Sequence, residues 1–229
     1  MHSVNPPRLT NRPSCIVGTA PKQLEVDQVR RTARHQDADV LIGVQGNRLV
    51  LVIGRSTPIA DEVDTDTRMP FIEIAAQLEP GFGPGHLVLG HEVATLVEAS
   101  KSAKAALAGF AVARAWRNAP RPTLADDLLP ERAFAGDPLA RSTLINRIYR
   151  PLQQHSTELL ATLWCYLDNG RSLEATAREL FVHPNTVRYR LKRISEVIGW
   201  DATGAREALI LQSALIIGSI AEPDANRKR

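Results

Sequence analysis

The chain is poor in cysteine: its 229 residues include two, Cys15 and Cys165, which lie far apart in the sequence. Two distant cysteines provide neither a disulfide framework nor a cysteine-rich zinc pattern. Such a composition fits a reducing compartment, and the first residues lack the basic region and apolar run of a signal peptide. We therefore expect a cytoplasmic protein.

The chain also lacks a long hydrophobic run and an excess of charge of one sign. Its longest apolar stretch, 208–221, is shorter than the roughly 20 residues of a membrane-spanning helix and is interrupted by Gln212 and Ser213. The 28 Lys and Arg residues against 25 Asp and Glu leave a net charge of +3, which indicates no nucleic-acid or membrane partner by itself. With 44% hydrophobic residues, the composition is that of an ordinary soluble protein.

The first half of the chain alternates between strand and helix patterns. Apolar runs typical of strands lie at 15–18, 40–44, 49–53 and 87–90, and stretches typical of helices lie at 24–35, at 71–78 and up to Trp116. The turn residues Gln45-Gly46-Asn47-Arg48 predict a β-hairpin, because glycine and asparagine tolerate the positive φ of a tight turn. The order β-α-β-β-α-β-α predicts an α+β fold in which helices cover one sheet.

Prolines mark the connection to a second part that is all-α. Between 118 and 138 the chain has four prolines, which exclude a long helix, and every pattern from Leu139 onward is helical. We therefore expect five segments: a flexible lead-in over 1–13, a first domain over 14–118, a proline-rich and helical connector over 119–150, an all-α domain over 151–221 and a flexible tail over 222–229. The strongly apolar final helix, 209–220, is a candidate interface, or it simply covers the domain core.

The all-α part contains two short helices joined by a brief turn. Ser172 suits the N-cap of the first helix, and Pro184 suits the first turn of the second, where its missing N–H costs nothing. Between them, 181–183 is too short for anything but a turn. The second helix has a buried stripe at helical spacing, formed by Val187, Leu191, Ile194 and Ile198. Two helices in this arrangement outline a helix-turn-helix.

The second helix carries hydrogen-bond donors away from its apolar stripe. Four of these side chains are positively charged, in a region, 156–220, that has seven basic and seven acidic residues in all. Asn185 suits adenine, arginine suits guanine or a phosphate, and Tyr189 suits either task or a thymine methyl group. Double-stranded DNA is therefore the expected partner, and the candidate DNA-binding residues are His183, Asn185, Thr186, Arg188, Tyr189, Arg190, Lys192 and Arg193.

Two alternatives stay open for these residues. The basic side chains would also fit the solvated face of an amphipathic helix, paired with Glu174, Glu179 or Glu196. His183 fits a phosphate or base contact and a helix cap about equally well. We favour DNA binding because capping, turn length and charge point to the same motif.

A homodimer is expected, since one short helix reads few base pairs and paired half-sites multiply specificity.

The segment 176–191, T-A-R-E-L-F-V-H-P-N-T-V-R-Y-R-L, closely resembles the C-terminal helix-turn-helix of PucR/CdaR-type bacterial transcription regulators, whose pattern reads roughly A-x-x-L-x-x-H-x-N-T-(V or L)-x-Y-R-L. The resemblance continues upstream through 160–167 and downstream through Gly199, Arg206 and Leu209. The first domain is similar to the degenerate GGDEF-like domain of this family, in its element order, in Ser102-Ala103-x-x-Ala106-Leu107 and in the 126–129 link. The resemblance implies a transcription regulator. Family members commonly carry a further sensory domain, for which this chain has no room, so we expect a truncated or minimal member.

The sequence motifs give little support to an enzymatic function. The hairpin turn has no acidic residue to hold Mg²⁺, so diguanylate cyclase activity is not expected if this hairpin is the equivalent one. The glycine-rich run 81–85 lacks a following Lys-Ser/Thr, and Pro84 removes an amide donor, so a plain loop is favoured over a phosphate site. His86, His91 and Glu92 lack metal-ligand spacing. We expect no enzyme, cofactor or metal. The alternative is a nucleotide- or metabolite-binding module whose small-molecule effector controls partner binding.

Overall fold

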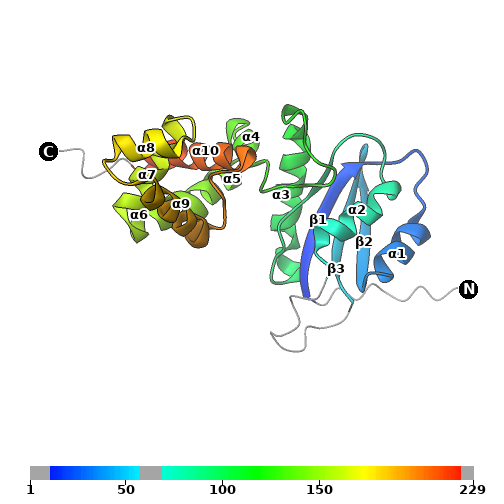
Figure 1. Ribbon diagram of the computed structural model, residues 1–229. Helices are drawn as coiled ribbons and strands as arrows, with labels where there is room; N and C mark the ends of the chain where they lie inside the picture. Colours follow the sequence, from blue (N-terminus) through cyan, green and yellow to red (C-terminus); the bar gives the residue numbers. More distant parts are fainter. Residues whose placement is uncertain (1–10, 57–68, 223–229) are drawn as a thin grey trace, which may run out of the picture. The chain divides into compact units, whose positions relative to one another are not determined.

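The computed structural model describes residues 11–56 and 69–222, which form two compact units divided between Ala135 and Gly136 (Figure 1). The division falls inside the segment 119–150 that the sequence marks as a connector. Each half of that segment belongs to one of the units. No helix of the described residues is both long and apolar enough to cross a membrane.

The first unit is built on a five-stranded sheet of order β2-β3-β1-β4-β5. Its strands are β1 (Asn11–Thr19), β2 (Ala38–Gln45), β3 (Arg48–Arg55), β4 (Leu87–Leu89) and β5 (Thr123–Leu124). All neighbours are antiparallel except β4 and β5. The expected hairpin is confirmed: β2 and β3 pair up to Gln45 and Arg48, and Gly46 between them has φ +61°.

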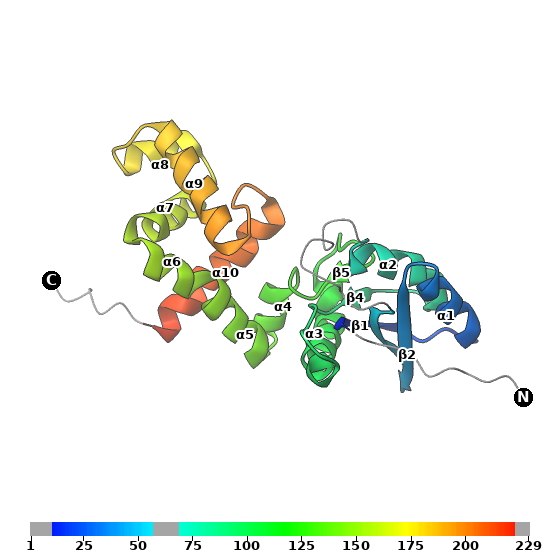
Figure 2. The same cartoon turned by 90° about the horizontal axis from the view of Figure 1, so that it is seen from below.

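Helices cover both faces of this sheet. Helices α1 (Val26–Arg34) and α2 (Phe71–Leu78) lie on one face and α3 (Ala99–Val112) on the other, as Figures 1 and 2 show. Successive side chains of β1 point to opposite faces of the sheet. Ile16 packs in the core between the sheet and helices α1 and α2, whereas Cys15 and Val17 pack under α3. The α+β fold class and the order β-α-β-β-α-β-α are thus confirmed.

The structure corrects the extent of two segments of the first unit. Strand β1 begins at Asn11, so 11–13 pair with β3 or lie beside the pairing residues and do not form a lead-in; the remainder of the lead-in lies outside the described residues. The expected connector contributes a strand to the sheet: Thr123 and Leu124 form β5 because they pair with the end of β4, and a turn over 125–128 follows. Helix α4 (Leu129–Phe134) follows, with Pro130 in its first turn, where proline is tolerated.

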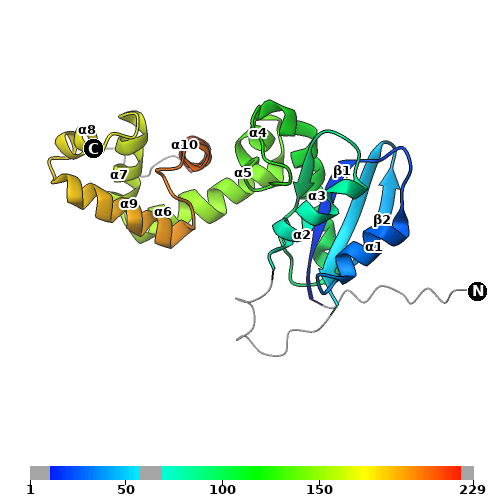
Figure 3. The ribbon, with the colours of Figure 1, turned by 45° about the vertical axis from the view of Figure 1, so that its right-hand side comes forward.

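The second unit is all-α, as expected. A continuous helical stretch runs through α5 (Pro138–Leu144), a π-helical turn (Ile145–Tyr149) and α6 (Arg150–His155), and therefore continues past residue 150, where the expected connector ends. It is followed by α7 (Thr157–Asp168), α8 (Leu173–Glu179), α9 (Pro184–Ile198) and α10 (Ala205–Ala221). Figure 3 shows α6, α7, α8, α9 and α10 of this unit. The expected tail after 222 lies outside the described residues.

Helix α10 closes the core of this unit. Ile210, Leu211 and Leu215 are fully buried, which agrees with a helix that covers the core. Gly218 lies against the ring of Tyr149 so closely that an added Cβ would come within 2.1 Å of its Cγ. The helix also leaves an uncharged stripe of Leu209, Ile216 and Ile220 exposed.

Candidate nucleic-acid interface

Side-chain caps begin the two helices of the expected helix-turn-helix. Ser172 Oγ accepts a hydrogen bond from Ala175 N at 3.2 Å at the start of α8. His183 Nδ1 accepts one from Asn185 N at 3.2 Å at the start of α9, where Pro184 occupies the first turn. The cap that was one of the two interpretations of His183 is therefore present. The cap uses one ring nitrogen of this exposed residue.

One face of α9 is anchored in the core of the second unit. Val187, Leu191, Ile194 and Ile198 are buried, as their spacing predicts, and α9 packs against α6, α7 and α8. The helix ends at Gly199, whose φ of +79° is the left-handed conformation that favours glycine. Figure 2 shows α8 and α9 meeting at their short turn. Because the apolar face packs against the core, the opposite face of α9 points away from it.

The opposite face of α9 presents polar side chains to solvent. Asn185, Arg188 and Lys192 are exposed, and Tyr189 is 70% exposed. Arg188 Nη1 donates to Asn185 Oδ1 at 2.6 Å, so the amide oxygen is already oriented along the helix face. These four side chains combine an amide, two cations and a phenol on one surface. Such groups suit both base edges and phosphates.

Arg190 differs from the other cations of α9 because it is tied to α7. Its Nη2 lies 2.8 Å from Glu158 Oε2, its Nη1 donates to Thr162 Oγ1 at 3.2 Å, and 20% of its side chain is exposed. Glu158 is 32 residues away and was not among the acidic partners that the sequence indicated. The contact links α9 to α7 through the Arg190 side chain.

Arg193 also has partners within the protein, and Thr186 is only partly accessible. Arg193 Nη1 lies 3.0 Å from Glu196 Oε2, one of the pairings that the solvated-face interpretation anticipated, and Arg193 Nη2 lies 3.3 Å from His155 Nε2. Because both Arg193 and Glu196 are about half exposed, solvent weakens this pair. Thr186 is half-buried in the first turn of α9. The candidate residues thus form two sets. The first is an exposed group on the face of α9 opposite the core, namely Asn185, Arg188, Tyr189 and Lys192. The second set caps the helix, is half-buried or pairs with acidic side chains, and consists of His183, Thr186, Arg190 and Arg193.

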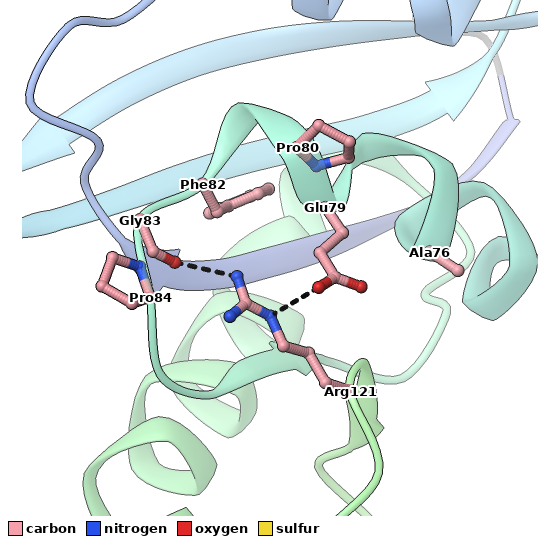
Figure 4. Close-up of a pocket in the computed structure, with 7 residues that line it drawn as sticks. All are labelled: Ala76, Glu79, Pro80, Phe82, Gly83, Pro84 and Arg121. Carbon is pink, nitrogen blue, oxygen red and sulfur yellow. Dashed lines mark hydrogen bonds and ion pairs between the residues drawn. The ribbon is translucent and has the colours of Figure 1, made fainter.

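The glycine-rich run in the first unit is a packed loop. The amides of Phe82 and Gly83 already donate to Glu79 O and Thr19 O, at 2.9 and 2.8 Å. Figure 4 shows the guanidinium of Arg121 filling the hollow beside this loop, where it donates to Gly83 O at 2.8 Å and lies 3.3 Å from Glu79 Oε1. A phosphate would meet a carbonyl and a carboxylate here, so the loop does not have the geometry of a phosphate cradle.

A separate cavity lies where β4 ends and α2 begins. Its volume is about 280 Å³, and its walls include Phe71, Leu89, His91, Glu92 and Leu124. Partial burial raises the pKa of Glu92, and the nearby arginine charges oppose this shift. Within the described ranges, no group of three or more His, Cys, Asp and Glu side chains is arranged to hold a metal ion. The cavity is therefore a pocket of mixed apolar and acidic character.

Comparisons with known proteins identify both units. The family model of the PucR C-terminal helix-turn-helix domain matches residues 159–217, and that of the GGDEF-like domain matches residues 8–112. An uncharacterized protein of Mycobacterium tuberculosis (strain ATCC 25618 / H37Rv) is 39% identical over 196 residues. This alignment covers 85% of the chain but 44% of that protein, so the chain spans less than half the length of this relative.

Two further relatives have a regulatory description. The proline-responsive transcriptional activator PutR of Bacillus subtilis (strain 168) is 43% identical over 54 residues, which are 24% of this chain and 13% of that protein. A regulator of polyketide synthase expression from Bifidobacterium adolescentis, known from a crystal structure, is 33% identical in sequence to this chain. The two structures match with a TM-score of 0.73, over 93% of this chain and 82% of that one. The chain therefore belongs to the PucR-type family of transcription regulators and joins a GGDEF-like domain to a C-terminal helix-turn-helix domain.

Proposed function

We propose that this chain is a non-catalytic, sequence-specific DNA-binding regulator that inserts α9 into the major groove of duplex DNA. The observation that carries the proposal is the division of α9 into a buried apolar face and an exposed face of donors. The major groove accepts an α-helix, and recognition helices present their N-terminal residues to base edges. The exposed group begins at Asn185, next to the capped N-terminus of α9.

Each exposed side chain has a distinct role in this proposal. Asn185 reads a base, with adenine as the preferred partner of an amide, and Tyr189 contacts a neighbouring base or its thymine methyl group. Arg188 and Lys192 neutralise phosphates, which supplies most of the affinity and makes it depend steeply on salt. Arg190 acts through Glu158 to hold α9 at its angle to α7, and His183 caps the helix.

A test is affinity selection of fragmented genomic DNA of the host with the purified chain. The matched control is the Arg188→Ala/Lys192→Ala variant at the same salt concentration. Recovery of a shared sequence motif by the unsubstituted chain alone would support the proposal. Equal recovery of all fragments by both proteins would show that α9 does not read sequence, and the proposal would fail.

We further propose that the chain binds its site as a homodimer. The exposed face of one recognition helix spans few base pairs, and two copies on half-sites about 34 Å apart would multiply the specificity. The uncharged exposed stripe of α10, Leu209, Ile216 and Ile220, is compatible with contact between identical surfaces, because no like charges would meet there. A two-fold-symmetric motif in the selected DNA would support a dimer.

The second candidate function is a small-molecule effector site in the first unit, whose ligand controls DNA binding. The cavity of about 280 Å³ at the end of β4 favours it, since this is close to the lower size limit of ligand pockets. A thermal-shift survey of nucleotides and small carboxylic and amino acids, repeated with a Leu124→Trp variant that enlarges a partly exposed side chain of the cavity wall, tests this proposal. A ligand that stabilises the unsubstituted chain alone would support it.

A further inference from the structure

Phe181, in the turn between α8 and α9, combines two unfavourable properties. Its side chain is 95% exposed, and its backbone has φ +53°, in the left-handed region that side chains disfavour. The turn is a Schellman motif, in which Val182 N donates to Ala177 O at 2.9 Å and Phe181 N to Arg178 O at 3.3 Å. Phe181 therefore occupies the position at which such motifs usually have glycine.

The same chain uses glycine after three other helices, although Asp37 after α1 and Arg171 after α7 also have positive φ, of +51° and +66°. Gly136 after α4, Gly170 after α7 and Gly199 after α9 have φ values of +89°, +61° and +79°. At the end of α8, the local backbone would equally favour glycine, and an apolar ring in water gains nothing from folding. Strained residues of this kind concentrate at functional sites, where a partner compensates their cost.

The surroundings of Phe181 indicate the chemistry of that partner. Phe181 lies two residues before His183, the cap of α9, and therefore next to the positive end of the helix dipole. From Phe181 to Arg193 the sequence contains four basic residues and no acidic one. On the preceding turn Arg178 and Glu179 are both exposed, and Glu179 Oε2 accepts a hydrogen bond from Asn169 Nδ2 at 2.6 Å. A partner that contacts the ring therefore meets a cationic edge of the protein and must present anions beside an apolar surface.

Duplex DNA has this combination, because the phosphates lie next to the deoxyribose rings and the thymine methyl groups of the groove wall. We propose that Phe181 is a DNA-contacting residue whose ring packs against this apolar surface where the N-terminus of α9 enters the major groove. The inference rests on the proposed function, which it extends from the polar face of α9 to the turn that precedes it. Burial of the ring in the complex would compensate both the exposure and the backbone conformation.

The test compares Phe181→Gly and Phe181→Tyr with the unsubstituted chain in thermal unfolding and in binding to a duplex recovered by the genomic selection. Glycine relieves the backbone strain and removes the exposed ring, so the Phe181→Gly variant should unfold at the same or a higher temperature. Its DNA affinity should nevertheless fall by roughly tenfold or more, as expected when one apolar ring is no longer buried. The Phe181→Tyr variant keeps the ring and should bind within about threefold of the unsubstituted chain. Phe134→Ala, which removes a 72% exposed ring from the first unit, is the matched control and should bind as the unsubstituted chain does.

The outcomes separate the inference from the proposed function. If Phe181→Gly binds normally while Arg188→Ala/Lys192→Ala is impaired, the inference is wrong and the proposed function stands. A lower unfolding temperature for Phe181→Gly would mean that the ring supports the fold, which also overturns the inference. If the unsubstituted chain retains no duplex, both proposals fail. A duplex with deoxyuridine in place of thymidine identifies the contact: loss of the Phe181 effect indicates the methyl groups, and its persistence indicates the deoxyribose.

Discussion

Asn185 is the side chain to which we assign base reading, and its neighbour Arg188 holds the amide oxygen through a 2.6 Å hydrogen bond. Substitution Asn185→Ala removes the side-chain carboxamide, with its donor and its acceptor, from the groove without changing the charge of α9. We expect a loss of about 1–3 kcal/mol on the preferred site and a relaxed preference at one base position. Competition binding to a site library randomised at single positions measures this. A uniform loss across all sequences would contradict the assignment.

Arg188 is expected to act mainly on the phosphate backbone. Substitution Arg188→Ala should weaken binding to all sequences and reduce the slope of log affinity against log salt concentration by about one, because one fewer counterion is released. The measurement is a salt titration of binding to a specific and a scrambled duplex. Lys104→Ala is the control, since it removes one exposed positive charge from α3 in the first unit. An equal change in slope for both variants would show that the slope depends only on the net charge of the protein, and not on a phosphate contact of Arg188.

At the scale of elements, the contact between Arg190 and Glu158 ties α9 to α7. Because Arg190 is 20% exposed and Glu158 is 69% exposed, solvent screens the pair, and we expect a coupling of about 0.5–1 kcal/mol in the free energy of unfolding. A double-mutant cycle of Arg190→Ala and Glu158→Ala in urea unfolding provides this value. Additive losses would show that the pair contributes nothing.

DNA binding by the same two variants distinguishes a positioning role of Arg190 from direct contact. If Arg190 holds α9 in place, Arg190→Ala and Glu158→Ala should reduce the affinity for DNA to a similar degree. A direct contact would show as a loss in Arg190→Ala that Glu158→Ala does not reproduce. Removal of the Glu158 charge alone would by simple electrostatics favour DNA, so a loss of affinity in Glu158→Ala would be specific evidence for positioning.

At the scale of the whole molecule, the expected homodimer predicts a particular stoichiometry. On a duplex with two half-sites one helical turn apart, two copies should bind, and an insertion of about five base pairs between the half-sites should reduce the affinity because it rotates one half-site to the opposite side of the duplex. Light scattering of the purified complexes measures the number of chains. One chain per duplex, with no effect of the insertion, would contradict the dimer.

The elements whose causes are local can be predicted from the sequence alone. The two-residue turn at Gly46 and Asn47, the buried stripe of α9, the cap at Ser172 and the stop at Gly199 all follow from the conformational preferences and spacing of neighbouring residues. The order of strands and helices and the helix-turn-helix follow in the same way. The exposed group on α9 was also foreseeable, because the buried stripe defines the opposite face.

The tertiary structure decided what depends on residues distant in the chain. Strand β5 forms because Thr123 lies beside Val88 of β4, and Arg190 is tied to α7 because Glu158 is brought within 2.8 Å of it. The spacing of apolar residues in the sequence does not predict these pairings, because they depend on how separate elements pack. The exposed ring and left-handed backbone of Phe181 belong to the same class, because only the path of the chain between α8 and α9 shows that nothing in the described structure covers this side chain.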